Sequence, residues 1–306
     1  MSSTGGVGPS SALETIEPGG LDLLGAAPRP LRKDVWRRFR QNKMAMVGLG
    51  FICIIGLLAI FAPLVAPFSI TDRAVGQYRK GPSADHWFGT DTIGRDVFSR
   101  VIYGARVSLK IGLAASLIAL TIGVLLGAVA GFFGGILDTI ITRITDVFLS
   151  IPYIVLAVAI ASVLGRSERT VILVLGLTGW LSICRIVRSS FLSLKQVEYV
   201  EAATALGYSR SRTMFRHILP NALQPIIVYG TISVGSVILA EAALSFLGVG
   251  PQDPTPAWGL MVSEGKSLIA VAPHLLFFPG TAIFLTVVSL VFMGDGLRDA
   301  LDPKLK

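Results

Sequence analysis

Six apolar stretches alternate with polar segments along the chain. They cover residues 44–66, 111–133, 147–165, 170–187, 221–244 and 275–294. A helix needs about 20 residues to cross the hydrocarbon core of a bilayer, and each stretch is about that long. The fourth ends beside Arg185 and Arg188, whose long side chains can reach the interface from a helix end. The pattern therefore predicts an all-α membrane protein with six transmembrane helices.

The polar segments divide the rest of the chain. Residues 1–30 are rich in Gly, Ser and Pro, which predicts a disordered tail. Residues 31–43 place apolar and basic side chains on opposite helical faces, which favours a basic helix lying on the membrane surface; a merely solvated run of charge is the alternative. Residues 67–110 are expected to form an external loop and residues 195–220 a second polar loop.

Charge indicates the orientation. Basic residues concentrate between Arg29 and Lys43, before the first span, and positive residues favour the cytoplasmic side. An even number of spans returns the C-terminus to that side and places the 195–220 loop there too. The 67–110 loop is also fairly basic, but long loops cross the membrane largely regardless of charge. Both termini are therefore expected in the cytoplasm.

Composition narrows the class of protein. The 306 residues are 52% hydrophobic and 15% charged, which is too apolar for an ordinary soluble domain. A net charge of +8 would suggest nucleic acid in a soluble protein. Here the basic residues flank apolar runs, so the expected partner is the lipid bilayer and not nucleic acid. Cys53 and Cys184 lie inside apolar stretches, which argues against a disulfide.

No chemistry is expected of this chain itself. It contains no Gly-x-x-x-x-Gly-Lys-Ser/Thr phosphate loop, so it is not expected to hydrolyse ATP. Its three histidines, His86, His217 and His274, lack metal-ligand spacing. We therefore expect no catalytic residue, no metal and no cofactor in this chain.

The 195–220 loop has a helix–glycine–helix pattern. Helix-forming residues run up to Gly207, which suits a helix C-terminus. A second short pattern has Met214, Phe215 and Ile218 on one side and arginines on the other, and it ends at Leu219-Pro220. Two short amphipathic helices at a membrane surface can form a docking site for another protein. The pattern predicts a membrane protein whose movement is driven by a separate protein.

This spacing resembles the EAA loop of ATP-binding-cassette importer permeases. The match comprises Glu201, Ala202, Ala203, Gly207, Leu219 and Pro220. One position departs from the family, because His217 replaces the usual apolar residue before x-Leu-Pro. Its side chain is expected to sense pH or to form an interface hydrogen bond.

Further segments resemble the dipeptide/oligopeptide/nickel permease subfamily, and in particular its second, C-type subunit. These segments are residues 86–100, 241–248, 256–259 and 294–303. The resemblance runs from about residue 37 to 303. It implies a type I importer permease fold (MetI-like), with a core permease domain at 111–306. It also implies a subunit that carries di- or oligopeptides across the bacterial cytoplasmic membrane.

The resemblance further implies a set of partners. These are a second homologous permease subunit in a heterodimer, one or two ATPase subunits that carry ATP and Mg, and an extracytoplasmic binding protein. Nickel chelates, haem or another small solute are alternative cargoes. An ATP-independent secondary transporter is a rival from another class, but it needs ionisable groups near mid-membrane, and Glu241 alone comes close.

The expected ATPase-coupling residues follow from the EAA resemblance. They are Glu198, Glu201, Ala202, Ala203, Gly207, Arg210, Arg216, Leu219 and Pro220. The two alanines would allow close approach to the ATPase, Glu201 would make a polar contact or fix the loop, and Gly207 would permit the turn. The arginines, with Arg212, would pair with acidic ATPase residues or with lipid headgroups.

Two other sets of residues are singled out. Gly123, Gly127, Gly131 and Gly135 recur every four residues, which predicts close helix packing. An outer gate or binding-protein contact is expected at Asp91, Arg95, Asp96, Glu241 and Trp258. Capping and packing roles are the alternative for the loop residues. For Glu241 the alternative is a hydrogen bond to a neighbouring helix end.

Overall fold

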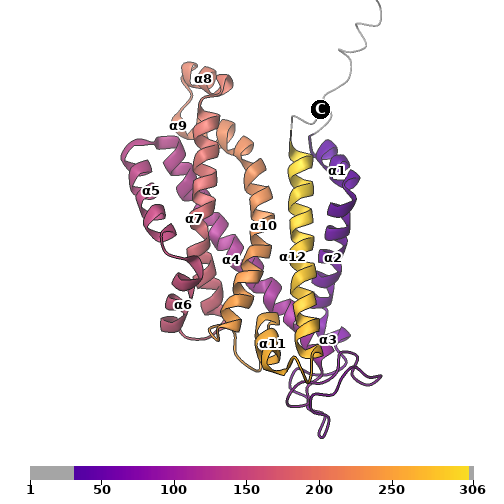
Figure 1. The fold of residues 1–306 in the computed structure, drawn as a ribbon. Coiled ribbons are helices and arrows are strands. Elements are labelled where there is room, and N and C mark those ends of the chain that lie inside the picture. The colour runs from indigo at the N-terminus through magenta and orange to yellow at the C-terminus, as the bar shows by residue number, and fades with distance from the viewer. Residues whose placement is uncertain (1–30, 303–306) are drawn as a thin grey trace, which may run out of the picture.

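A computed structural model describes residues 31–302, and within this range the chain is all-helical, without a β-strand (Figure 1). The predicted tail at 1–30 lies outside the described residues. The helices are α1 (Leu31–Gln41), α2 (Lys43–Ile60), α3 (Ala62–Val65), α4 (Val97–Phe133), α5 (Gly135–Leu149), α6 (Tyr153–Leu164), α7 (Glu168–Lys195), α8 (Glu198–Ala205), α9 (Arg210–Thr213), α10 (Leu219–Phe246), α11 (Trp258–Gly265) and α12 (His274–Leu301). A π-helical segment, Met214–Ile218, joins α9 to α10, and a 3-10 turn, Lys266–Leu268, follows α11.

Five helices are long and apolar enough to cross a membrane. They are α2, α4, α7, α12 and the continuous helix Arg210–Phe246. The pair α5–α6 makes a sixth span if it counts as one, but it bends by 86°. The predicted single helix at 147–165 is therefore wrong. The chain breaks between Leu149 and Tyr153, and the 12-residue α6 is only about 18 Å long.

The predicted external loop is shorter than expected, because α4 begins at Val97 and residues 97–110 are helical. The carboxylate of Asp96 starts this helix by accepting the backbone N–H of Ser99 at 2.7 Å. Its 37 residues extend about 55 Å, which exceeds the roughly 30 Å of a hydrocarbon core. It runs obliquely behind the other spans (Figure 1).

The bundle has two distinct ends. One carries α8, α1 and the C-terminal end of α12, and we call it the α8 end (Figure 1). The other carries α3, α11 and residues 67–96, and we call it the α11 end. The predicted surface helix at 31–43 is helical over Leu31–Gln41. It is also tied to α12, because Phe39 and Ala300 share a buried cluster and Arg38 donates to the Asp302 carbonyl.

Three glycines set the contact between α4 and α7. A Cβ built on Gly123 or Gly131 would lie 2.6 Å from the Cβ of Ile183 or Phe191, respectively. At Gly127 it would lie 2.6 Å from the carbonyl oxygen of Cys184. The prediction is wrong at the fourth position, Gly135. That residue opens α5 with a φ of +59° and would meet no atom within 4 Å.

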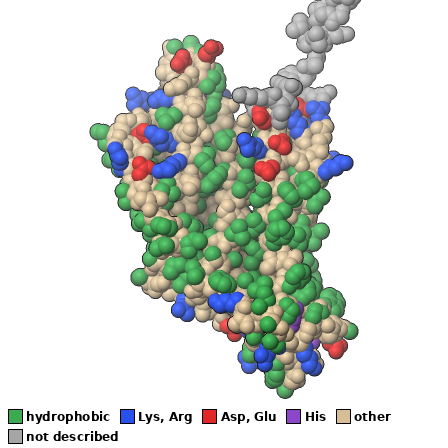
Figure 2. Space-filling model, in the orientation of Figure 1, with side chains coloured by type: hydrophobic (Ala, Val, Ile, Leu, Met, Phe, Trp, Pro, Cys, Tyr) green, Lys and Arg blue, Asp and Glu red, His purple; other side chains and the backbone are tan. Residues whose placement is uncertain are grey.

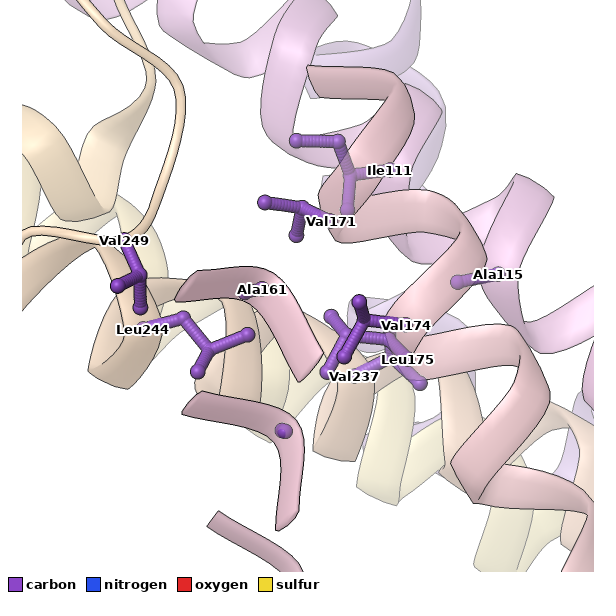
Figure 3. Close-up of a cluster of buried hydrophobic side chains, with 10 residues drawn as sticks. Ile111, Ala115, Ala161, Val171, Val174, Leu175, Val237, Leu244 and Val249 are labelled. Carbon is purple, nitrogen blue, oxygen red and sulfur yellow. The ribbon is translucent and has the colours of Figure 1, made fainter. Parts of the chain in front are cut away.

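A buried aliphatic cluster joins α4, α6, α7 and α10. Its members include Ile111, Ala115, Ala161, Val171, Val174, Leu175, Val237, Leu244 and Val249 (Figure 3). Because the two fully buried side chains of α6, Ala157 and Ala161, are small, this short helix can lie close against the longer ones. The cluster fixes the bent α5–α6 pair beside the main bundle.

Candidate functional site

The 195–220 loop projects from the α8 end, and a left-handed turn ends its first helix. Gly207 has a φ of +80°. Its N–H donates to Thr204 at 3.0 Å, and the N–H of Tyr208 donates to Ala203 at 3.2 Å. These two bonds satisfy the last carbonyls of α8. A side chain at Gly207 would strain this backbone, so glycine defines where the chain reverses.

Helix α8 has an anchored face and a free face. Val200 and Ala203, one helical turn apart, are only 2% and 4% exposed. Glu201 and Ala202 are exposed, and the acidic side chains of α8 stand at its tip (Figure 2). The prediction that Ala203 approaches a partner is therefore wrong, since it packs under the loop. Ala202 and Glu201 remain on the surface that a partner can reach.

The second helix of the loop is not a separate element. Ser209 caps α9 by accepting the N–H of Arg212, and α9 passes through the π-helical segment straight into α10. Leu219 and Pro220 thus occupy the first turn of α10. Proline is tolerated there because the backbone N–H that it lacks would have no partner within the helix. The second half of the loop is therefore continuous with a membrane-spanning helix.

His217 holds the two halves of the loop together. Its ring stacks on Tyr208 with centroids 5.6 Å apart, and its carbonyl accepts the hydroxyl of Tyr199 at 3.4 Å. The guanidinium of Arg212 lies 4.4 Å from the Tyr208 ring centroid, a cation–π distance. Among the predicted arginines, Arg210 and Arg216 are exposed. The side chain of His217 therefore contacts Tyr208, next to the glycine turn, whereas the bond from Tyr199 uses only its backbone carbonyl.

A hollow of about 490 Å³ lies beside α8. Glu201, Thr204 and Arg210 line one part of it, and Phe132 and Lys195 line another. Lys195 also donates to the carbonyl of Phe132 at 3.0 Å, which satisfies the C-terminal end of α4. The loop therefore rests on the ends of both α4 and α7.

The opposite, α11 end contains a charge cluster in which Asp91, Arg95 and Arg100 are buried and Asp253 is exposed. Arg95 pairs with Asp91 at 2.6 Å and with Asp253, and Arg100 pairs with Glu264 at 3.1 Å. Burial raises the pKa of Glu264 despite the two arginines. Burial also acts to raise the pKa of Asp253, but the hydrogen bond and charge of Arg95 outweigh it and leave that pKa below its usual value. The cluster fixes residues 91–100 to α11 and the segment before it.

A hydrogen-bond chain continues from this end into the bundle. Glu241 is fully buried and accepts the hydroxyls of Ser108 at 3.2 Å and Ser245 at 2.7 Å. Ser108 in turn accepts the backbone N–H of Trp258 at 3.2 Å, and the Trp258 indole donates to Val101 at 2.9 Å. The chain joins α4, α10 and α11.

These positions correct the prediction of binding-protein contacts. The five predicted residues are at most 5% exposed, so in this conformation they are not a contact surface. Asp96 caps α4, Asp91 and Arg95 form the charge cluster, and Trp258 packs against Gly104. The cluster could not be predicted at Arg100, Asp253 and Glu264, because no helical spacing relates these residues.

Comparison with known proteins decides the family. Residues 123–306 match the family described as the binding-protein-dependent transport system inner membrane component. Residues 30–82 match the N-terminal TM domain of oligopeptide transport permease C. The chain belongs to the binding-protein-dependent importer permeases. This permease is 45% identical to the "Dipeptide transport system permease protein DppC" of Alkalihalophilus pseudofirmus, covering 90% of both chains.

Two further relatives carry a different name. The chain is 46% identical to the "Glutathione transport system permease protein GsiD" of Shigella flexneri, covering 89% of this chain and 90% of that one. It is 44% identical to the protein of that name from Escherichia coli, with the same coverage. The fold class predicted from the apolar pattern and the predicted subfamily are thus confirmed. The permease is a multi-pass inner-membrane protein.

Proposed function

We propose that this permease carries short peptides inward and that α8 receives the driving force from a separate ATPase subunit. The observation that carries the proposal is the construction of α8. It stands clear of the bundle on a glycine turn, exposes Glu201 and Ala202, and is anchored through Ala203 and Val200. A small exposed residue beside a carboxylate suits close docking against a partner groove.

The same geometry supports a mechanism. A partner that binds two conformations equally drives nothing, so the ATPase must dock differently in its ATP-bound and ATP-free states. Helix α8 connects to α7 through two residues and to α10 through α9 and the π-helical segment. A displacement of α8 would therefore move α7, together with the α4 packed on it, and α10, and would open or close the path that they line.

This function assigns the two ends. The α8 end, with the described ends of α1 and α12, would face the cytoplasm, and the α11 end would face the extracytoplasmic binding protein. A second homologous permease subunit would complete the path. ATP and Mg would bind only to the ATPase subunits. The charge cluster at the α11 end would keep that end rigid while the spans move.

Peptides are the best-supported cargo. One relative is named for dipeptide transport and others for glutathione transport, and both names denote peptides. Nickel chelates, haem or another small solute are the alternative cargoes. An ATP-independent secondary transporter is less well supported, because Glu241 is already paired with two serines, Ser108 of α4 and Ser245 near the α11 end of α10.

Charge placed on α8 tests the docking role. Ala202→Glu adds a carboxylate on the free face without touching the anchored face, and Gly207→Asp strains the turn. Both should weaken copurification of the ATPase subunit and abolish uptake. Val75→Glu is the matched control for copurification of the ATPase, because Val75 is 89% exposed in the segment at the other end. Normal assembly and uptake in both α8 variants would refute the docking role.

A further inference from the structure

A cavity of about 200 Å³ lies at mid-height in the bundle, where α4, α7 and α10 face the bend between α5 and α6. One ordered water needs roughly 10–15 Å³, so the space is far larger than a packing defect. Its polar lining includes Ser116, Thr178, Ser182, Tyr229, Ser233 and Ser236. All are hydroxyl groups, and among the residues that the structure describes no charged side chain lines the cavity.

Ser116 is the unusual member. It is only 5% exposed, and its Oγ has no hydrogen-bond partner among the described residues. Buried hydroxyls are normally satisfied, because an unmade hydrogen bond costs free energy. A polar guest in the cavity would supply the missing partner. Ser116 therefore marks a position for a hydrogen-bonding ligand.

Two other hydroxyls are oriented differently. Thr178 donates to the carbonyl of Val174 at 2.7 Å, and Ser233 donates to that of Gly230 at 2.8 Å. A hydroxyl that donates to its own helix keeps its oxygen lone pairs as acceptors. The cavity thus offers a donor at Ser116 and an acceptor at Ser233. One lone pair of Thr178 already accepts the hydroxyl of Tyr153, which leaves the other for a guest. A backbone amide, with one C=O and one N–H, presents the complementary pair.

The charge of the walls limits the ligand. An unpaired ion is costly in an apolar environment, and this lining offers no counter-charge. Ser182 and Ser236, however, are exposed at the rim of the cavity. The charged ends of a short peptide can therefore remain outside the cavity, at this exposed rim, while an uncharged amide enters. A chelated metal ion would find no His, Cys, Asp or Glu in the lining.

We infer that this cavity is a transient subsite for a backbone amide of the peptide in transit. The amide C=O accepts from Ser116, and its N–H donates to Thr178 or Ser233. This inference rests on the proposed peptide import. Because every peptide carries the same amide, such a subsite guides cargo without selecting its side chains, and selection is left to the binding protein.

The test uses the assembled importer in proteoliposomes with its binding protein and ATP. The probes are labelled trialanine and its analogue with esters in place of both amides, which lacks both N–H donors. The parent should transport the amide roughly threefold to tenfold better than the ester, the span of one net hydrogen bond. Thr178→Val should reduce that ratio toward one. Any preference of the binding protein for the amide is the same for the parent and for Thr178→Val, so it cancels when their two ratios are compared.

Ser116 supplies the second arm. Ser116→Ala should lower trialanine transported per ATP hydrolysed by several-fold, and Ser116→Leu, which fills the cavity, should lower it further. Binding-protein stimulation of ATP hydrolysis should persist. Ser162→Ala is the control, because Ser162 is exposed outside the cavity and bonds only its own helix. An unchanged ratio in Thr178→Val together with parental coupling in Ser116→Ala would overturn the subsite. Uptake that needs no ATP in the parent would instead overturn the proposed function.

Discussion

The contact between α4 and α7 gives the sharpest stability prediction. In Gly127→Ala, the new methyl would lie 2.6 Å from the carbonyl oxygen of Cys184 and 2.8 Å from the Cβ of Val187. Non-bonded heavy atoms prefer about 3.5–4.0 Å, so the two helices must separate by about 1 Å. Neither blocking atom is the end of a flexible side chain, so rotamer changes cannot relieve the clash.

The expected cost follows from two opposing effects. Overpacking a tight contact costs about 1–3 kcal/mol, and alanine recovers up to about 1 kcal/mol of helix propensity relative to glycine. The net destabilisation is about 1–2 kcal/mol, or roughly fivefold to thirtyfold in the ratio of folded to unfolded protein. SDS titration of the purified permease in mixed micelles, followed by tryptophan fluorescence, measures the change.

A matched control isolates the packing effect. Gly56 lies in α2, and an added Cβ there would meet no atom within 4 Å. Gly56→Ala should be neutral or slightly stabilising, since only helix propensity changes. Equal stability of Gly127→Ala and Gly56→Ala would refute the reasoning, because it would mean that glycine at Gly127 is not needed for close approach.

Three further predictions concern the two ends. Trp258→Phe removes the indole donor to Val101 and should cost about 1 kcal/mol in the same unfolding titration. The pKa of Asp253 is held below its usual value, because Arg95 outweighs the effect of burial. Its stabilisation is therefore present above the usual Asp pKa and is lost as pH falls through the lower folded value. The thermal midpoint should fall on acidification toward about pH 3, and less so in Asp253→Asn; identical profiles would contradict this. Gly207→Ala forces an alanine into a left-handed conformation, which costs about 1–2 kcal/mol. It should therefore speed tryptic cleavage within 195–220. Unchanged cleavage would show that the turn is not strained.

Apolar run length predicted the spans well, because burial in lipid demands long uninterrupted helices. It failed at 147–165, where hydropathy is continuous but the backbone bends at Ser150–Pro152. Proline was visible there, yet prolines at Pro225 and Pro279 lie inside continuous helices. Whether a proline bends or breaks a helix depends on neighbouring packing, which a linear pattern does not contain.

The candidate site was predictable only in part. Gly207 was identifiable, because a left-handed turn leaves glycine as a local signal. The opposite orientations of Ala202 and Ala203 could not be predicted, since both residues are small and both belong to the motif. The buried pairs among Arg95, Arg100 and Glu264 come from distant parts of the chain. Pairing of that kind depends on tertiary structure and leaves no spacing to detect.

Cross-linking from α8 tests the central claim most directly. A single cysteine at Ala202, introduced after Cys53 and Cys184 are replaced by serine and alanine, should cross-link to the ATPase subunit with a short bifunctional reagent in the assembled importer. The yield should change between the ATP-bound and nucleotide-free states. A cysteine at Val271, which is 71% exposed at the α11 end, should give no such product. Cross-linking from Val271 but not from Ala202, or a yield from Ala202 that nucleotide never changes, would contradict the account.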